Sequence, residues 1–158
     1  MPSVDTVVET TLPPENVREA LLDFSDRRPD IWPGLTRELY EVYSVGETTA
    51  DVKEGTKMPV ATVWARERYD WSDPDTVRWT VEESNFCAPG SFVSATTRRR
   101  DDGGTRVEIH WERTPTSLMG KIASRLIVAT KGKPIAASVE KALRKLETEK
   151  VSDTSGGV

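Results

Sequence analysis

The residues best suited to chemistry in this sequence are Glu67, Tyr69, Glu83 and Arg113. Apolar side chains in residues 60–71 favour one phase of a strand, and Glu67 and Tyr69 share that phase. A carboxyl group removed from water has a raised pKa and can act as a general acid or base. We therefore take Glu67 and Tyr69 as candidate catalytic residues, with Glu83 and Arg113 near the ends of the same face. The alternatives are a structural Glu–Arg pair, or a register that places Glu67 in water.

Other residue types that support catalysis are scarce. His110 is the only histidine, and it lies on the outer phase of its strand, so we expect a solvated residue. Cys87 stands in a loop without a base nearby in sequence, which indicates an inert or mildly reactive thiol. One histidine and one cysteine make a zinc site implausible, and no phosphate loop, dinucleotide fingerprint or nucleophile elbow is present. The sequence predicts neither a metal nor a cofactor.

A basic run, Arg98 to Arg100, precedes two aspartates, Asp101 and Asp102. Such a run could bind phosphate. Because the chain as a whole is acidic, we favour the alternative of a hairpin end that neutralises itself.

The elements that must position these residues follow from the spacing of apolar side chains. A β-rich opening segment is stopped by Pro13 and Pro14, where a helix begins. Six further strands and a long amphipathic helix from Ser117 follow, and we expect Pro134 to break or kink that helix. The expected strands span residues 4–12, 37–45, 48–53, 60–71, 76–83, 91–100 and 105–113.

This order predicts an α+β fold. A curved antiparallel sheet of about seven strands wraps around the long C-terminal helix, and two short helices follow the first strand. We expect one domain over residues 1–150 and a disordered tail over residues 151–158.

Strand registers can be derived in part from the turns. A loop of odd length around Ser72–Asp75 places Tyr69 opposite Trp79 and Glu67 opposite Val81, so that Glu67 points inward. A loop of even length would bury Arg66 and Arg68 instead, and we prefer the odd loop.

The next turn contains Asp102-Gly103, a strong hairpin signal. Read as a two-residue turn, it places Ser94 opposite Trp111 and Thr96 opposite Ile109, with all four on the inner face. The small residues Ser94 and Thr96 opposite large ones leave room, or let a helix approach.

A cavity between the sheet and the last helix is expected to hold an apolar ligand. The alternative is ordinary core packing. The predicted lining residues are Val63, Glu67, Tyr69, Trp79, Val81, Ser94, Thr96, Ile109, Trp111, Ile122 and Leu126.

Composition restricts partners and location. The chain has 158 residues and a formal net charge of −4, which argues against nucleic acid and gives no reason to expect attraction to anionic lipid. A single cysteine allows no internal disulfide and favours a reducing compartment. There is no apolar run long enough for a transmembrane helix and no visible signal peptide. We expect a soluble, cytoplasmic protein.

The sequence resembles the START/birch-allergen-like (SRPBCC) superfamily, in its polyketide cyclase/dehydrase branch. The resemblance covers residues 4–149 and departs from the usual pattern at Pro134, within the last helix. It implies a helix-grip fold whose members bind or transform lipids, sterols, polyketides and other apolar compounds. The matching features are the opening strand, Leu12-Pro13-Pro14-Glu15-Asn16-Val17, Leu21-Leu22-Asp23-Phe24, Trp32-Pro33, the strand series, Gly103-Gly104-Thr105-Arg106-Val107 and the final helix.

Three functions are compatible with these features. The first is binding or carriage of a hydrophobic small molecule. The second is cyclisation, dehydration or aromatisation of a polyketide-like substrate, with Glu67 or Tyr69 moving protons. The third is a protein-interaction module that acts through its surface. The oligomeric state is open.

Overall fold

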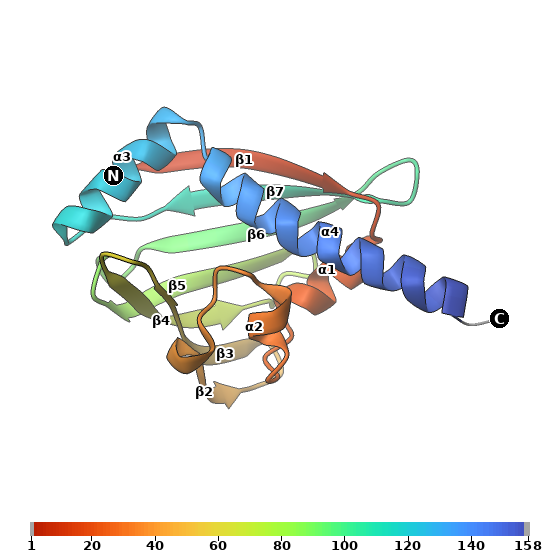
Figure 1. Cartoon of the computed structure of the whole chain (residues 1–158), viewed down its shortest axis with the longest axis horizontal. Helices are drawn as coiled ribbons and strands as arrows, with labels where there is room; N and C mark the ends of the chain where they lie inside the picture. The colour runs from red at the N-terminus through yellow and green to blue at the C-terminus, as the bar shows by residue number, and fades with distance from the viewer. Residues whose placement is uncertain (1, 157–158) are drawn as a thin grey trace.

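A single antiparallel sheet of seven strands forms the body of the domain in the computed structural model, which describes residues 2–156 (Figure 1). The strands lie in the order β1-β7-β6-β5-β4-β3-β2. Their bounds are β1 Ser3–Thr10, β2 Glu41–Val45, β3 Thr49–Lys57, β4 Thr62–Asp70, β5 Thr76–Ser84, β6 Phe92–Arg99 and β7 Thr105–Glu112.

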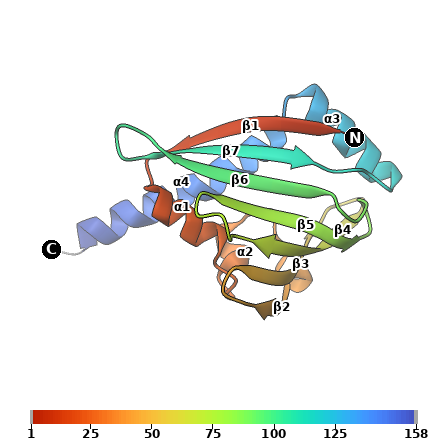
Figure 2. The same cartoon turned by 180° about the vertical axis from the view of Figure 1, so that it is seen from behind.

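Helices cover one face of this sheet. The expected short helices after the first strand are α1 and α2, and a 3-10 turn, η1, precedes β2. The view from behind shows the sheet in front of the long helix α4 (Figure 2). The α+β helix-grip prediction is therefore confirmed. The helices span α1 Pro14–Leu21, α2 Arg28–Ile31, η1 Arg37–Leu39, α3 Leu118–Ala129 and α4 Lys133–Gly156.

The long helix α4 is held against the sheet in its middle and in the turn that follows. Ala142 and Leu143 are almost completely buried. Glu147 fastens the following turn to the end of β1, because its carboxylate accepts hydrogen bonds from Thr10 Oγ1 (2.6 Å) and from the Thr11 amide (3.1 Å). Nearer the start of α4, Ser138 is exposed. This part of the helix also packs on the sheet through its other face, since Ile135 and Val139 contact the core and the preceding Gly132 is buried against Thr6 of β1.

The expected break at Pro134 is present as a boundary between α3 and α4. The amide of Gly132 donates to Ile127 O (2.8 Å) and the amide of Lys131 to Val128 O (3.1 Å), the two bonds of a Schellman motif. Lys131 and Gly132 adopt positive φ angles of 56° and 79°. Pro134 lies in the first turn of α4, where a missing amide hydrogen is tolerated.

The predicted tail, residues 151–158, lies partly outside the residues that the structure describes. α4 continues to Gly156, and residues 157–158 lie outside the described residues. The division into a domain over residues 1–150 and a disordered tail over residues 151–158 stays a prediction.

The register of β4 and β5 is the expected one. Glu67 pairs with Val81 and Tyr69 with Trp79, so Glu67 points into the interior. The placement of Glu83 was wrong. The register shifts between Arg66 and Glu67, so that Glu83 pairs with Arg66 and is exposed. An extra residue in one strand moves every later side chain to the other face.

The predicted register of β6 and β7 was wrong by one residue. Trp111 pairs with Val93 and Ile109 with Ala95, whereas Ser94 and Thr96 pair with His110 and Glu108. This shift turns Ser94 and Thr96 to the outer face.

The turn between β6 and β7 explains the shift. Arg100 and Gly104 close the hairpin through an amide-to-carbonyl bond of 2.9 Å, which leaves three residues in the loop. Gly103 takes a positive φ of 86°, the conformation that ends a three-residue loop built on a type I turn. An Asp-Gly pair is compatible with this turn and with the two-residue turn, so it identified the hairpin without fixing its register.

Replacing Gly104 by alanine should destabilise the domain. A Cβ at this position would lie 2.4 Å from Thr10 O and 3.3 Å from Thr11 Cα, both backbone atoms. We expect a loss of about 2 kcal/mol, or a melting temperature lower by roughly 4–8 °C. The control is Gly46→Ala, where the nearest atom would be Thr49 O at 3.5 Å. Equal melting temperatures for the two variants would contradict the close approach of β1 to Gly104.

Candidate ligand-binding site

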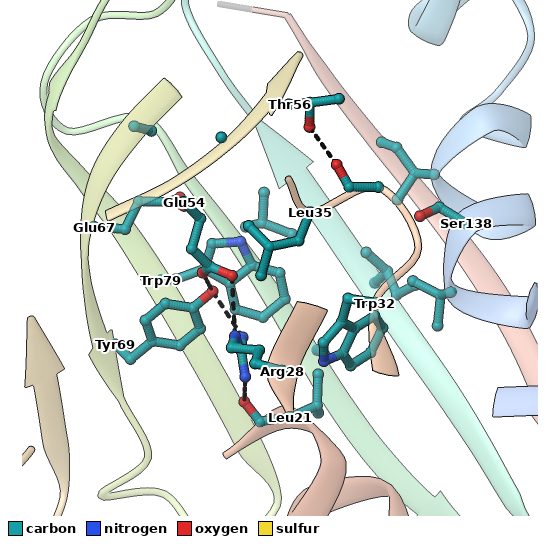
Figure 3. A pocket seen from close by; sticks show the side chains of 18 of the residues that line it. Leu21, Arg28, Trp32, Leu35, Glu54, Thr56, Glu67, Tyr69, Trp79 and Ser138 are labelled. Carbon is teal, nitrogen blue, oxygen red and sulfur yellow. Dashed lines mark hydrogen bonds and ion pairs between the residues drawn. The ribbon is translucent and has the colours of Figure 1, made fainter. Parts of the chain in front are cut away.

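A cavity of about 330 Å³ lies between the sheet and α4 (Figure 3). The inner faces of β3 to β7 form one wall, and α1, α2 and the first half of α4 form the other. Most lining side chains are apolar. They include Val17, Leu21, Trp32, Leu35, Val63, Ala65, Trp79, Phe86, Val93, Ala95, Val107, Ile109, Ile135, Val139 and Leu143.

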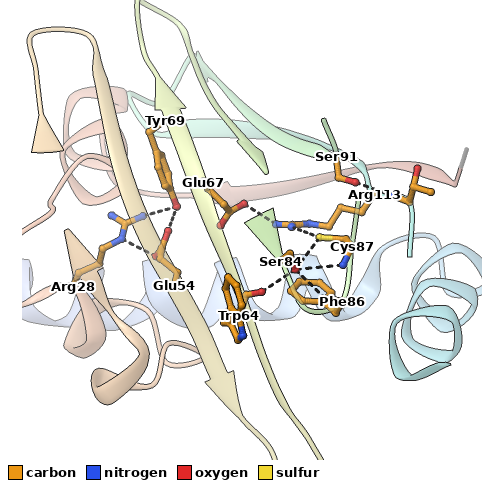
Figure 4. A network of polar contacts seen from close by, with 11 residues as sticks. Arg28, Glu54, Trp64, Glu67, Tyr69, Ser84, Phe86, Cys87, Ser91 and Arg113 are labelled. Carbon is orange, nitrogen blue, oxygen red and sulfur yellow. Dashed lines mark hydrogen bonds and ion pairs between the residues drawn. The ribbon is translucent and has the colours of Figure 1, made fainter. Parts of the chain in front are cut away.

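The first polar group in the cavity is a cluster of Arg28, Glu54 and Tyr69 (Figure 4). Arg28 donates from Nε to Glu54 Oε2 (3.0 Å) and from Nη2 to the Tyr69 hydroxyl (3.1 Å), and that hydroxyl donates to Glu54 Oε1. Arg28 also donates to Leu21 O (2.9 Å) and Asp23 O (3.0 Å). A guanidinium with all these donors occupied is a fixed charge that holds α2 against the sheet.

The second polar group is the pair of Glu67 and Arg113. Arg113 Nη2 donates to Glu67 Oε2 (3.1 Å), and Arg113 Nη1 contacts the buried thiol of Cys87 (3.5 Å). The side chains of Glu67 and Arg113 are only 6% and 13% exposed. The second oxygen of Glu67, Oε1, has no hydrogen-bond partner within the described part of the chain, and Glu67 lines the cavity. Oε1 is therefore free to accept a hydrogen bond from a ligand.

Burial and neighbouring charges together shift the pKa of the cavity's ionisable side chains. Loss of water raises the pKa of Glu67 to about 7, although the positive charge of Arg113 opposes the change. Loss of water also raises the pKa of Tyr69 well above its usual value, and the negative charge of Glu54 adds to this effect. For Arg28 and Arg113, burial alone would lower the pKa, but the neighbouring carboxylates raise it. Near neutral pH, Glu67 can therefore hold or release a proton inside an apolar cavity.

Five of the predicted lining residues do line the cavity, and six do not. Val81 and Trp111 are buried outside it, the former beside Ala65 and Cys87. Ile122 and Leu126 are 56% and 57% exposed, because the face that α3 turns to solvent carries them. Ser94 and Thr96 lie on the outer face, as the register of β6 requires. The five that line the cavity are Val63, Glu67, Tyr69, Trp79 and Ile109, and their role in ligand binding stays a prediction.

Sequence reasoning missed Arg28 and Glu54. Glu54 could have been found, because Ala50, Val52 and Glu54 alternate on one phase of β3, as Glu67 does on β4. Arg28 lies in the four-residue helix α2, which is too short to show a period.

The remaining candidate residues have structural roles. His110 faces outward and its Nδ1 lies 2.8 Å from Asp5 Oδ1. Arg98, Arg99 and Arg100 each form an ion pair with an acidic residue, as expected of a neutralised hairpin end; the partners are Glu108, Glu15, and Glu9 with Asp102. Over residues 2–156, no group of three or more His, Cys, Asp or Glu side chains could hold a metal ion.

Comparison with known proteins agrees with this geometry. The family model "Polyketide cyclase / dehydrase and lipid transport" matches residues 1–149. No curated protein sequence matches the chain. Among the described helices, none combines the length and the hydropathy needed to cross a membrane.

Similar solved structures share the fold. The Zhui aromatase/cyclase from a Streptomyces species has a TM-score of 0.74 at 13% identity, with 94% of each chain covered. A protein from Thermus thermophilus has a TM-score of 0.73 at 18% identity, covering 91% of this chain and 95% of that one. A START superfamily protein from Mycobacterium smegmatis has a TM-score of 0.71 at 9% identity, covering 91% and 98%. At these identities the likeness is one of fold alone.

The raised pKa of Glu67 predicts a stability that falls as pH rises. The folded protein keeps a proton on Glu67 up to about pH 7, whereas the unfolded chain releases it near 4.5. The free energy of unfolding should therefore decrease between these values, by up to about 3 kcal/mol, and level off above them. Glu67→Gln removes this contribution, so the difference in unfolding free energy between wild type and Glu67→Gln should decrease across the same range. Denaturant titrations at a series of pH values measure it.

The control is Glu82→Gln, an exposed carboxylate on the neighbouring strand. Its difference from wild type should stay flat with pH. A flat difference for Glu67→Gln as well would show that burial does not raise the pKa of Glu67.

Proposed function

Because the chain belongs to the polyketide cyclase/dehydrase and lipid transport family, we propose that it binds a hydrophobic small molecule in the cavity between the sheet and α4. The observation that carries this proposal is an interior left open between apolar walls. A cavity of about 330 Å³ with a few fixed polar groups is typical of small-molecule sites.

The polar groups support a particular kind of ligand. Arg28, Glu54 and Tyr69 bind one another, so they shape the cavity without requiring a ligand. Glu67 differs, because its Oε1 has no partner among the described residues and the residue lines the cavity. An apolar molecule with one hydroxyl or other hydrogen-bond donor fits this arrangement, since the donor would satisfy Oε1 while the remaining surface contacts the walls.

A second candidate function is acid–base catalysis on a polyketide-like substrate. The specific observation in its favour is a carboxyl group with a pKa near 7 facing the cavity. A group that titrates near the working pH is effective in proton transfer. The Zhui protein named above is an aromatase/cyclase with the same fold. The predicted catalytic pair, Glu67 and Tyr69, stands side by side on β4.

The location and partners follow the same reasoning. The single cysteine, Cys87, supports a reducing, cytoplasmic location. The acidic net charge supports the exclusion of nucleic acid from the proposed partners.

Ligand binding can be tested by filling the cavity. Val139 on α4 lines the cavity, whereas Ala137, two residues away, is exposed. Val139→Trp should lower the affinity for bound compounds at least about tenfold, and Ala137→Trp should leave it unchanged. Ligands are first sought by solvent extraction of protein purified from cells and by thermal shift across lipids, sterols and polyphenols. Protein that is empty and shifts with none of them would contradict the proposal, as would equal affinities for the two variants.

Catalysis can be separated from binding at Glu67. Glu67→Gln should abolish turnover of a polyketide-like substrate while ligand binding, measured by thermal shift, is retained. In the wild type, the rate should change with a midpoint near pH 7, rising with pH if Glu67 acts as a base and falling if it acts as an acid. The control Glu83→Gln alters an exposed carboxylate and should keep full activity. Unchanged turnover in Glu67→Gln would remove this residue from the mechanism.

A further inference from the structure

Helix α3 presents its apolar side chains to solvent. Leu118, Ile122 and Leu126 recur every four residues, so they lie on one face of the helix. They are 75%, 56% and 57% exposed. The opposite face carries Gly120 and Ser124, which are buried against the rest of the protein. A helix that only contributed to the core would face the other way.

A second exposed apolar segment is the turn between β3 and β4. Met58 is 38% and Val60 is 80% exposed, and Pro59 between them is also exposed. Thr56 and Val63, which flank this turn, both line the cavity. The turn therefore stands at the rim of the cavity.

These two segments lie at the same end of the sheet (Figures 1 and 2). The start of α3 packs on the loop after β5, where the Thr116 amide donates to Phe86 O (3.0 Å) and Phe86 lines the cavity. Gly34 and Ser138 line the cavity and are exposed, so the cavity reaches solvent there. Thr56 Oγ1 donates to Gly34 O (2.6 Å), which joins this opening to the β3–β4 turn (Figure 3).

Charge is segregated along the segment that contains α3. Residues 114–139 contain four of the 22 basic residues of the chain and none of its 26 acidic residues. All four are exposed, and none forms an ion pair with any residue in the described part of the chain. The basic residues are Lys121, Arg125, Lys131 and Lys133.

We propose that α3 and the β3–β4 turn form a surface that docks on an anionic lipid bilayer. The apolar stripe of α3 would enter the boundary between headgroups and acyl chains, as amphipathic helices do. Lys121 and Arg125 flank the stripe and lie at headgroup level, where each cation is attracted to anionic lipid. The opening of the cavity then faces the end of the molecule nearest the bilayer.

Charge complementarity favours a bilayer over a second copy of the chain. Two copies packed through the stripe would bring Lys121 and Arg125 of each near those of the other, with no acidic residue in this segment to neutralise them. Net charge alone predicted no attraction to anionic lipid, because an average over 158 residues conceals a basic segment in an acidic protein. Docking does not depend on what the cavity binds. Transfer of a ligand between the cavity and the bilayer would rest on the proposed function.

The test is co-sedimentation of the full chain with vesicles. We expect binding to vesicles of about 70% phosphatidylcholine and about 30% phosphatidylglycerol, weakened by salt, and little binding to phosphatidylcholine alone. The double variants Ile122→Ser/Leu126→Ser and Lys121→Glu/Arg125→Glu should each bind at least about tenfold more weakly. The control Arg68→Glu/Arg106→Glu makes the same charge change on exposed residues of the outer sheet face and should bind as wild type does, or nearly so.

Several results would overturn the proposal. The wild type could remain in the supernatant with anionic vesicles, or it could bind both vesicle types equally. The Arg68→Glu/Arg106→Glu control could also lose as much vesicle binding as Lys121→Glu/Arg125→Glu does. A wild-type dimer in sedimentation velocity that Ile122→Ser/Leu126→Ser dissociates would assign the stripe to a second copy instead. Circular dichroism checks that each variant folds, and if the serine variant does not, the charge-reversal variant decides. Ligand affinity of the same variants, measured without vesicles, reports on the cavity separately.

Discussion

Two carboxylates, Glu54 and Glu67, lie on the inner face of neighbouring strands, and each requires a cation or a proton inside the protein. Glu67 pairs with Val52 across β3 and β4, and Glu54 stands diagonal to it on the same face. A buried carboxylate is tolerated only when it is neutralised or paired. The two cations that answer this requirement, Arg28 and Arg113, come from α2 and from the segment after β7. The charges thus tie elements far apart in sequence to the middle of the sheet.

The cavity lies between these charges and the apolar face of α4. In the middle of the helix Leu143 is almost completely buried, and Glu147 fastens the next turn to the end of β1. Nearer the start of α4, Ile135 and Val139 pack on the core and also line the cavity, and Ser138 is exposed at the rim. Glu54 and Glu67 line the opposite side of the cavity, which the sheet forms. A ligand in this space would contact aliphatic side chains on one side and carboxylates on the other.

The fold and part of the candidate site could be predicted from the sequence. Glu67 and Tyr69 were placed inward correctly because that register matches apolar residues with apolar residues, whereas the alternative sets Arg66 and Arg68 against Val81 and Trp79. No such mismatch separated the two registers of β6 and β7. Either Ser94 or Ala95 can face the interior, since both are small, and the turn that decides between them differs by one residue. Alternation is a local signal, so it could not reveal the bulge that moved Glu83 outward or the distant helix that supplies Arg28.

The pairing of each carboxylate with an arginine from elsewhere in the chain constrains how the protein can diverge. A change of Glu67 to an apolar residue leaves the buried charge of Arg113 without its carboxylate, and a change of Arg113 leaves Glu67 buried without its cation, so either step alone destabilises the fold. The same holds for Glu54 and Arg28. Among descendants of this sequence, positions 67 and 113 should therefore be exchanged together, as should 54 and 28. The polar groups of the cavity can then change only by paired substitutions, whereas the aliphatic lining residues can be substituted one at a time.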